Sequence, residues 1–411
     1  MSKFARRTAR WLTRLRRRFY LLNDTFTTDL AAGAVNGTSA EPGPGTRAVV
    51  DTGSKAVLSS GRLVVASAAP GSGNPLLTYA AHVRSPGRFV KVEITPVSGA
   101  SPARVGWNSA QGSGFGSDTL RFNASGVLGT TIGASESAQV GTWTAASYEV
   151  IVITRVSGLT YFIKGGAFTN WTLLWIANAG TTTPLYPVIA AVNAGAGFSS
   201  DYIRSPELFW LPSPLLSDGF GATFGLSDGL GHAEGVAEGR GRGGDGLPYT
   251  QGGTWANASG TASSTVLSGG TSSFTYAACG SADVIATVKF TRAGGDGGLL
   301  LRYADGNNFI TCRHDGTNVL LIKKVANVNT TVQTTVVTYA AGAELRVIAT
   351  GSAFRVYYNN ALVGTEQTIA DAALQTPANH GLYTTNVGNT FDDLVIYARG
   401  TGGEYAALDA V

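Results

Sequence analysis

The chain has 411 residues, of which 55 are glycine and only 14% are charged. Abundant glycine, threonine, serine, valine and alanine are typical of short strands joined by turns, so a mainly helical fold is excluded. No apolar run reaches the roughly 18 residues of a membrane-spanning helix. Two cysteines are too few for a disulfide scaffold.

Residues 1–22 form a basic arm. They hold eight Lys and Arg and no acidic residue, so the rest of the chain has 22 basic and 26 acidic residues and the net charge of +4 describes the arm. Apolar residues recur at spacings of three, four and seven, which predicts an amphipathic α-helical anchor. Its key residues are Phe4, Trp11, Leu12, Leu15, Phe19 and Leu22, with Arg14, Arg16, Arg17 and Arg18.

This arm has several candidate partners. Docking against an acidic protein surface, as part of a small oligomeric bundle, is the favoured interpretation. An anionic membrane is the alternative, and a plain solvated tail is a third. A secretory signal does not fit, because the arm has no continuous apolar core. The charge balance behind the arm gives no reason to expect specific nucleic-acid binding.

Residues 23–212 and 216–400 read as two copies of one domain. The segment 23–26 returns at 217–220, the segment 148–166 returns at 344–359, and 185–189 with 207–210 return at 380–383 with 393–396. The matches keep their order, which indicates tandem duplication, since solenoid repeats have periods of about 20 to 50 residues. A Pro-containing linker is expected at 213–215 and a C-terminal tail at 401–411.

Each copy is expected to be an antiparallel sandwich of two sheets. Apolar and polar residues alternate in strand-like segments such as 89–94 and 284–290. Asp, Asn and Gly at 304–308 and 314–318 favour hairpin turns. The predicted fold class is therefore all-β, with two tandem jelly-roll β-sandwiches behind a short N-terminal amphipathic α-helix.

The second copy resembles the concanavalin A-like lectin/glucanase superfamily, in particular its laminin-G-like members of bacterial and phage origin. The first copy resembles it more weakly, through residues 24–26. The likeness rests on segments 216–220, 246–249 with 252–255, 299–303 with 308–312, and 391–397. It implies the sandwich fold and carbohydrate binding, without naming the glycan. Phage tail and capsid-decoration proteins look similar in layout, which favours a virion setting.

Glycosidase activity is not expected. Laminarinase-type members of the superfamily carry a Glu-x-Asp-x-x-Glu strand that supplies the nucleophile and the acid, and this chain has no such strand. Glu93 and Glu149 have no partner carboxylate at the needed spacing in the sequence. A divergent glycoside hydrolase is kept as an alternative.

Sugar-binding lectin-like sheets use exposed aromatic side chains with polar groups nearby. Most aromatic residues of a sandwich belong to its core, so each candidate has to be tested against that interpretation. The segment holding Trp171 and Trp175 has no counterpart in the second copy and could cover a sheet edge or contact a neighbouring subunit. The candidates are Trp107, Trp143, Trp171, Trp175, Tyr303 and Phe309.

Calcium is the candidate metal. Many members of the superfamily hold Ca²⁺ between the opening segment and the last strand, where this chain has Asp218, Asp392 and Asp393. The alternative is that these aspartates shape a turn or face solvent. Cys279 and Cys312 either pair, if their strands are neighbours, or are free buried thiols, which is favoured.

The sequence therefore predicts a non-enzymatic, homo-oligomeric protein of the virion surface, from a phage tail or a capsid decoration. It would display two lectin-like domains, bind surface glycans, and contact other virion proteins through the arm. The alternatives are a bacterial cell-surface or secreted carbohydrate-binding protein, and a purely structural module with no glycan ligand.

Overall fold

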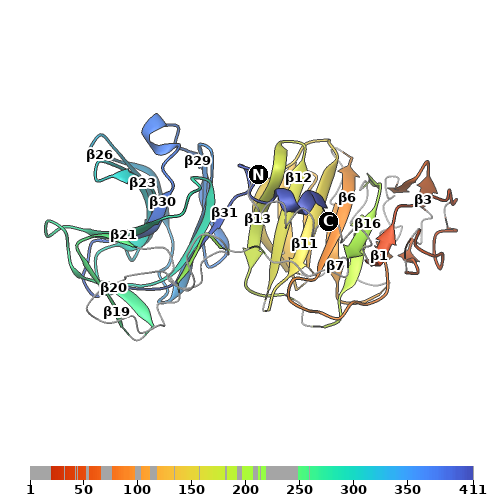
Figure 1. Ribbon diagram of the computed structural model, residues 1–411, viewed down its shortest axis with the longest axis horizontal. Helices are drawn as coiled ribbons and strands as arrows, with labels where there is room; N and C mark the ends of the chain where they lie inside the picture. The colour runs from red at the N-terminus through yellow and green to blue at the C-terminus, as the bar shows by residue number, and fades with distance from the viewer. Residues whose placement is uncertain are drawn as a thin grey trace, which may run out of the picture. The chain divides into compact units, whose positions relative to one another are not determined.

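The computed structural model shows an almost entirely β chain (Figure 1). It describes residues 20–410 except 32, 42, 44, 52–54, 66–75, 98–102, 112–117, 134, 157, 181–182, 192–196, 207–211, 213, 219–248 and 259. Within these residues there is no α-helix, and the helical elements are two 3₁₀ helices, Ala372–Leu374 (η1) and Ala406–Ala410 (η2). Two compact units are present: unit 1 comprises residues 1–211 and 405–411, and unit 2 comprises 212–404.

Unit 1 is an antiparallel sandwich of two sheets. Its nine-stranded sheet has the order β13 (Phe168–Ala177), β12 (Leu159–Gly165), β11 (Tyr148–Thr154), β6 (Phe89–Pro96), β15 (Phe198–Ser200), β4 (Arg62–Val65) and β3 (Ala56–Ser59), with β16 (Ile203–Pro206) between β6 and β1 (Tyr20–Asp24). Its seven-stranded sheet has the order β10 (Ser135–Thr142), β9 (Val127–Ile132), β8 (Asp118–Phe122), β7 (Ala103–Asn108), β14 (Tyr186–Ala191), β5 (Leu76–Thr78) and β2 (Ala48–Val50).

Unit 2 has the same construction. Its eight-stranded sheet has the order β19 (Thr254–Ala258), β20 (Thr261–Val266), β31 (Thr390–Ala398), β22 (Val284–Thr291), β27 (Ala343–Thr350), β28 (Ala353–Tyr358) and β29 (Ala361–Thr368), with β17 (Leu216–Asp218) on β31. Its seven-stranded sheet has the order β18 (Thr250–Gly252), β21 (Ser273–Ala278), β30 (Asn379–Thr384), β23 (Gly297–Asp305), β24 (Asn308–His314), β25 (Asn318–Val325) and β26 (Val328–Val336).

The strand orders of the two units match position by position, as the duplicated sequence predicts. The run β10-β9-β8-β7-β14-β5-β2 corresponds to β26-β25-β24-β23-β30-β21-β18, and β13-β12-β11-β6 corresponds to β29-β28-β27-β22. The first strand of each copy pairs with the last, β1 with β16 and β17 with β31. One difference concerns the last strand, because β31 is continuous whereas β15 and β16 share its place in unit 1. The matched segment 207–210 lies outside the described residues.

Side chains from both sheets fill the space between them. In unit 1 the indole Nε1 of Trp107, on β7, donates to the carbonyl of Val152 on β11, at 3.0 Å. In unit 2 the ring of His314, on β24, lies 5.0 Å from that of Tyr358 on β28. These contacts cross from one sheet to the other, so each unit has a closed core of its own.

The N-terminal prediction needs a correction at its end. Strand β1 begins at Tyr20, and Leu22 is fully buried in unit 1. The predicted helix therefore cannot extend to residue 22, because strand pairing with β16 replaces the helical period there. The other predicted anchor residues, Phe4, Trp11, Leu12, Leu15, Phe19, Arg14, Arg16, Arg17 and Arg18, lie outside the described residues.

The end of the chain returns to unit 1. The ring of Tyr405 packs edge-on against Phe162 of β12 with centroids 4.9 Å apart. Asp409 of η2 accepts a hydrogen bond of 2.9 Å from the indole of Trp171 and forms an ion pair with Lys164. Figure 1 shows η2 lying over β11 and β12. Residues 405–410, which the sequence assigns to a tail, thus cover an outer face of unit 1.

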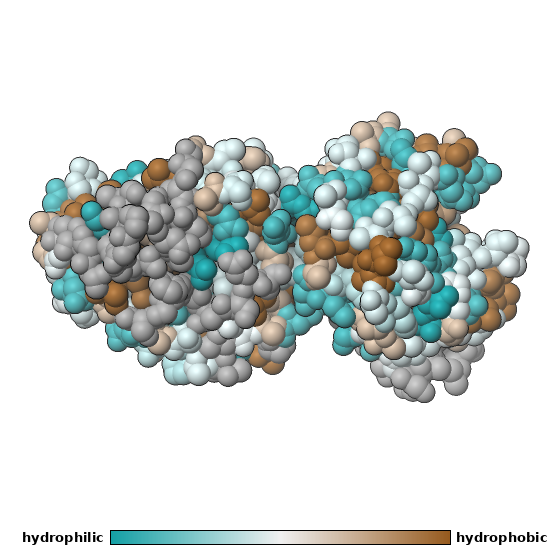
Figure 2. All heavy atoms as spheres, turned by 180° about the vertical axis from the view of Figure 1, so that it is seen from behind, coloured by the Kyte–Doolittle hydropathy of each residue, from teal (hydrophilic) through white to brown (hydrophobic). Residues whose placement is uncertain are grey.

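The fold also shows the state of the two cysteines and the lengths of the described helices. Cys279 and Cys312 are free and buried, and burial raises the pKa of the Cys312 thiol. Among the described residues no helix is long and apolar enough to cross a membrane. Figure 2 shows apolar patches on the described surface of unit 2, separated by polar regions.

Candidate functional site

The four tryptophan candidates of the first copy are buried. Trp107 and Trp175 are fully enclosed, and Trp171 and Trp143 are 2% and 7% exposed. Trp143 donates from Nε1 to the carbonyl of Asn123, and Trp171 is held by Asp409. None of these rings presents a face to which a sugar could bind, because the core and the C-terminal segment cover them. They are structural residues of unit 1.

The two candidates of the second copy lie together on one sheet face. Tyr303, at the end of β23, and Phe309, on β24, have ring centroids 5.9 Å apart and planes inclined by 24°. Three further rings join them, and we call the set of five the aromatic row. It consists of Phe274 and Tyr276 of β21, Tyr383 of β30, Tyr303 and Phe309.

Strand periodicity places these rings on the outward face of the seven-stranded sheet. On β21, Phe274 and Tyr276 are partly exposed while the alternating residues Thr275 and Ala277 are buried, as expected of a strand with one face in the core. Phe274 is directly opposite Tyr383 of the neighbouring strand β30. The sequence could have suggested Phe274 and Tyr276 from their alternation, whereas Tyr383 joins them only through a long-range strand pairing.

The rings lie close and nearly parallel. Tyr276 and Tyr303 stack with centroids 4.4 Å apart, and Phe274 lies 5.0 Å from Tyr303. Phe309 extends the row to Tyr383 at 6.3 Å. Interplanar angles between 22° and 36° make this a shallow, continuous aromatic surface. Tyr303 is the most enclosed member, and burial raises the pKa of its hydroxyl.

Two cationic side chains border the row. The guanidinium of Arg313 lies 4.9 Å from the centre of the Tyr383 ring and pairs with Asp296 at 2.8 Å. The ammonium of Lys324 lies 5.4 Å from the Phe309 ring and donates to the carbonyl of Gly306. Cations over ring faces are favourable electrostatically. The row therefore combines apolar faces with hydrogen-bond donors at its border.

The described residues of unit 1 form no such row at the places that correspond to β21 and β30. Backbone pairing of His82 with Leu185 and of Cys279 with Ala378 aligns β5 with β21 and β14 with β30. Leu76 then takes the place of Phe274, and Ala190 takes the place of Tyr383. These two residues belong to an aliphatic cluster with Val188 and Val50. The two copies therefore share a fold but differ in the chemistry of this face.

The structure corrects one sequence inference about carboxylates. Glu93 of β6 and Glu149 of β11 are directly opposite each other in the nine-stranded sheet, although they are far apart in the sequence. Glu149 forms an ion pair of 3.0 Å with Lys91 and accepts a hydrogen bond from Tyr202. Glu93 accepts from the backbone N of Asp201 at 2.6 Å and is nearly buried. Both carboxylates are thus engaged in a network within unit 1.

Of the calcium candidates, Asp392 and Asp393 are each engaged by a protein group. Asp393 pairs with Lys289 at 2.5 Å, and Asp392 accepts from the backbone N of Asp393. The side chain of Asp218 lies outside the described residues. Among the residues the structure does describe, no group of three or more His, Cys, Asp or Glu could hold a metal ion. A lysine is the cation that Asp393 contacts.

Asp24 is the counterpart of Asp218 in the first copy, and its carboxylate is bound by protein side chains. Its buried carboxylate accepts two hydrogen bonds of 2.7 Å from the Arg47 guanidinium and one of 2.8 Å from Tyr79. The backbone N of Phe26 donates to it as well. A guanidinium, rather than a metal ion, thus balances the carboxylate in unit 1.

Comparison with known proteins finds only distant structural likeness. No protein-family model matches the sequence, and no curated protein matches it. Solved structures with a similar fold include carbohydrate-binding module CBM66 from Bacillus subtilis, at 18% identity, covering 36% of this chain and 95% of that one, with a TM-score of 0.32. LamAcat from Zobellia galactanivorans matches at 12% identity, 46% and 98% coverage, and a TM-score of 0.33. The exoplasmic/lumenal domain of VIP36, in a Ca²⁺/Man3GlcNAc-bound form, matches at 9% identity, 47% and 92% coverage, and a TM-score of 0.34.

Proposed function

We propose that this protein is a non-enzymatic glycan-binding protein whose binding face is the aromatic row of unit 2. The observation that carries the proposal is that four partly exposed rings gather around Tyr303, itself 8% exposed, on the outward face of one sheet. Leaving so many aromatic faces at a surface is unfavourable unless a ligand covers them.

A saccharide suits this surface because sugars are amphipathic. Their C–H faces stack on aromatic rings, while their hydroxyls need donors and acceptors at the border. Arg313 and Lys324 supply donors beside Tyr383 and Phe309. The ligand would therefore lie along the rings, with its hydroxyls directed toward these two cations.

Unit 1 has a structural role in this proposal and does not bind the glycan. At the places of Phe274 and Tyr383 it has Leu76 and Ala190, and its four described tryptophans are in the core. We assign it a structural role, as the sandwich that joins unit 2 to the N-terminal arm. Residues 1–19, with eight basic and no acidic residues, would attach the protein to a larger surface assembly. A phage virion, with the protein in a tail or a capsid decoration, is the setting we propose.

The ligand proposal is tested with a glycan array, followed by calorimetric titration with laminarin and arabinan. Tyr303→Ala and Phe309→Ala should each weaken binding by about tenfold, as expected of a central aromatic contact worth more than 1 kcal/mol. Tyr186→Ala is the matched control, because Tyr186 lies on β14, the unit 1 counterpart of β30. No binding across the array, or equal binding by all three variants, would reject the row as the site.

The absence of activity is tested separately. Wild-type protein should release no reducing sugar from β-glucans, since Glu93 and Glu149 are engaged with Lys91, Tyr202 and the backbone of Asp201. Turnover that disappears in Glu149→Gln would replace this proposal with glycoside hydrolysis at the paired carboxylates of unit 1.

A further inference from the structure

We propose that Arg302 is the positioning residue of the aromatic row, holding Tyr303 out on the sheet face where the other four rings meet it. The inference rests on the proposed function, in which the row binds a glycan. Arg302 itself is fully buried, so it acts through Tyr303 and not by touching the ligand.

Strand β23 ends irregularly. Its pairing with β24 is regular from Gly297 to Leu301 and resumes only where Asp305 faces Asn308. Three residues, 302–304, therefore lie opposite the single residue Phe309. Such a bulge redirects a side chain relative to the regular strand. The residue redirected here is Tyr303, whose ring reaches both Tyr276 and Phe309.

The backbone of Arg302 adopts an unusual conformation. Its φ is +47°, in the left-handed region that residues with a side chain rarely adopt. A glycine would take this conformation at little cost, yet the chain has an arginine here. Conformations of this kind persist only where the surroundings hold them, and they are common at ligand-binding sites.

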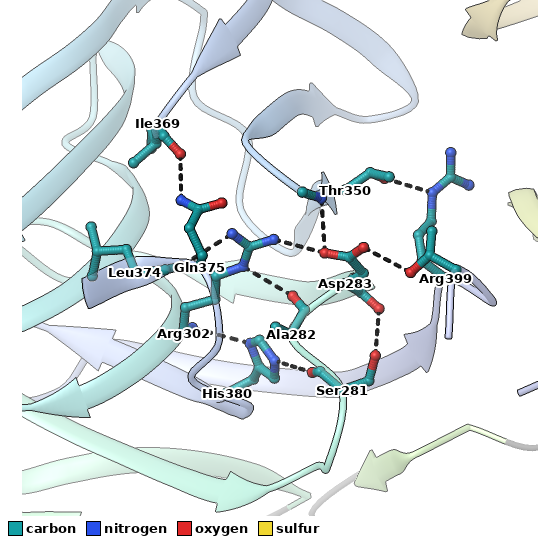
Figure 3. Close-up of polar contacts among 12 residues, drawn as sticks. Ser281, Ala282, Asp283, Arg302, Thr350, Ile369, Leu374, Gln375, His380 and Arg399 are labelled. Carbon is teal, nitrogen blue, oxygen red and sulfur yellow. Dashed lines mark hydrogen bonds and ion pairs between the residues drawn. The ribbon is translucent and has the colours of Figure 1, made fainter. Parts of the chain in front are cut away.

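The guanidinium of Arg302 donates to three acceptors (Figure 3). Its Nε donates to the carbonyl of Ala282 at 3.0 Å, Nη1 donates to the carbonyl of Leu374 at 3.1 Å, and Nη2 donates to Asp283 at 2.9 Å. The backbone N of Arg302 also donates to Nδ1 of His380 at 3.3 Å. The planar guanidinium reaches three separate acceptors, which the single ammonium of a lysine cannot reproduce.

Asp283, the partner of Arg302, also accepts hydrogen bonds from segments near the end of unit 2. Its Oδ1 also accepts from the backbone N of Gly351 at 2.9 Å, and its Oδ2 accepts from the Thr401 hydroxyl at 2.7 Å. Figure 3 shows Asp283 between Arg302 on one side and the segments of Thr350 and Arg399 on the other. The bulge at Arg302 is thus linked through Asp283 to the segments of Gly351 and Thr401. A change in one of these segments alone leaves the other contacts of Asp283 in place.

Unit 1 supplies an internal comparison. Strand β7, which takes the place of β23, pairs with β8 without interruption from Ala103 to Trp107. No residue of β7 other than Gly106 has a positive φ. In this alignment Trp107 takes the place of Leu301 and Asn108 that of Arg302, so the left-handed backbone of Arg302 is not shared by the corresponding described residue of unit 1.

The test compares Arg302→Lys and Arg302→Ala with wild type in the full chain. Two readouts are used: the near-ultraviolet circular dichroism of the stacked tyrosines, with Tyr303→Phe assigning the band, and affinity for laminarin and arabinan. Both variants should lose most of the Tyr303 band and bind about tenfold more weakly at temperatures well below unfolding. Asp283→Asn is the second variant, expected to act in the same direction if Arg302→Ala does not fold.

Arg47→Lys is the matched control, since it loses a buried Arg–Asp pair in unit 1. It should change neither the Tyr303 band nor the affinity. A folded Arg302→Lys protein with the wild-type band and affinity would overturn the positioning role. If wild type binds neither polysaccharide nor any glycan of the array, the proposed function fails, and the Tyr303 band still decides the role of Arg302.

Discussion

The rings of Tyr276 and Tyr303 stack although their strands, β21 and β23, are not neighbours in the sheet. Strand β30 runs between them, and its Gly381 is paired with Tyr276 on one side and Leu300 on the other. A Cβ at Gly381 would lie 2.0 Å from the carbonyl oxygen of Thr275, so the strands can only approach this closely at a glycine. The stacked pair of tyrosines therefore depends on a third strand that contributes no side chain at that point.

Ring faces, not hydroxyls, are expected to provide the binding energy. Tyr276→Phe and Tyr303→Phe retain the apolar surface, so affinity for a bound glycan should change by no more than about twofold, whereas Tyr276→Leu should weaken it by about tenfold. Calorimetric titration distinguishes the two cases. A large loss in the Phe variants alone would show that hydrogen bonding by the hydroxyls dominates.

Acid should destabilise unit 2 through His380. Burial lowers the pKa of His380 from 6.5 to about 4, and its Nδ1 must stay unprotonated to accept from the backbone N of Arg302. The unfolded chain takes up this proton near pH 6.5 and the folded chain only near pH 4. Stability is therefore complete above pH 6.5 and falls as the pH drops toward 4, by roughly 3 kcal/mol for a shift of this size.

Nuclear magnetic resonance titration of the His380 ring checks this directly, and thermal unfolding between these pH values checks the linkage. His380→Gln should flatten the pH dependence of the unit 2 transition. A His380 ring that titrates near pH 6.5 in the folded protein would contradict the prediction.

The buried pair of Asp24 and Arg47 should make unit 1 sensitive to loss of one charge. Arg47→Met leaves the Asp24 carboxylate buried with only Tyr79 and backbone donors, at a cost of about 3 to 5 kcal/mol. Adding Asp24→Asn removes the unpaired charge and should recover part of that loss. Denaturant unfolding of the two variants measures the difference, and equal stabilities would show that charge is not the cause.

Removing residues 405–411 should destabilise unit 1, not unit 2. The deletion exposes the surface covered by the buried Tyr405 and Leu408, at a cost of about 3 kcal/mol. Asp409→Ala should cost less, about 1 kcal/mol, because its ion pair with Lys164 is half-exposed. Calorimetry should show only the unit 1 transition moving, with Trp171 fluorescence changing in both variants. The exposed substitution Ala407→Ser is the control and should leave both unchanged.

Two N-terminal deletions should separate attachment from folding. Removing residues 1–19 should leave both units folded and abolish incorporation into the proposed assembly. Removing residues 1–24 should also unfold unit 1, because β1 carries the buried Leu22 and Asp24. Thermal unfolding and copurification with the assembly are the measurements. Attachment that survives the shorter deletion would refute the anchor.

The sequence predicted most of the fold because strand alternation and duplication are local or order-preserving signals. It named Tyr303 and Phe309 as separate candidates, and the hairpin of β23 and β24 brings them together. The other members of the row come from β21 and β30, whose pairing depends on the complete sheet. Leu22 was assigned to a helix because spacing alone cannot show that β16 pairs with its backbone.

The tryptophans show a second limit of prediction from the sequence, which is the choice of strand face. Aromatic residues in alternating segments fit either face of a strand, and the choice is made by what the opposite sheet and distant segments supply. For Trp171 that partner is Asp409, 238 positions later in the chain. No periodicity within β13 could have indicated such a contact.

Because residues 405–410 belong to unit 1, a truncation within unit 2 also affects unit 1. A stop codon anywhere in unit 2 removes that copy and also the segment that covers β12 and β13 of the first. Unit 1 is likewise incomplete on the ribosome until all of unit 2 has been translated. The second copy is therefore difficult to lose by simple truncation, even in a lineage where its aromatic face has no ligand.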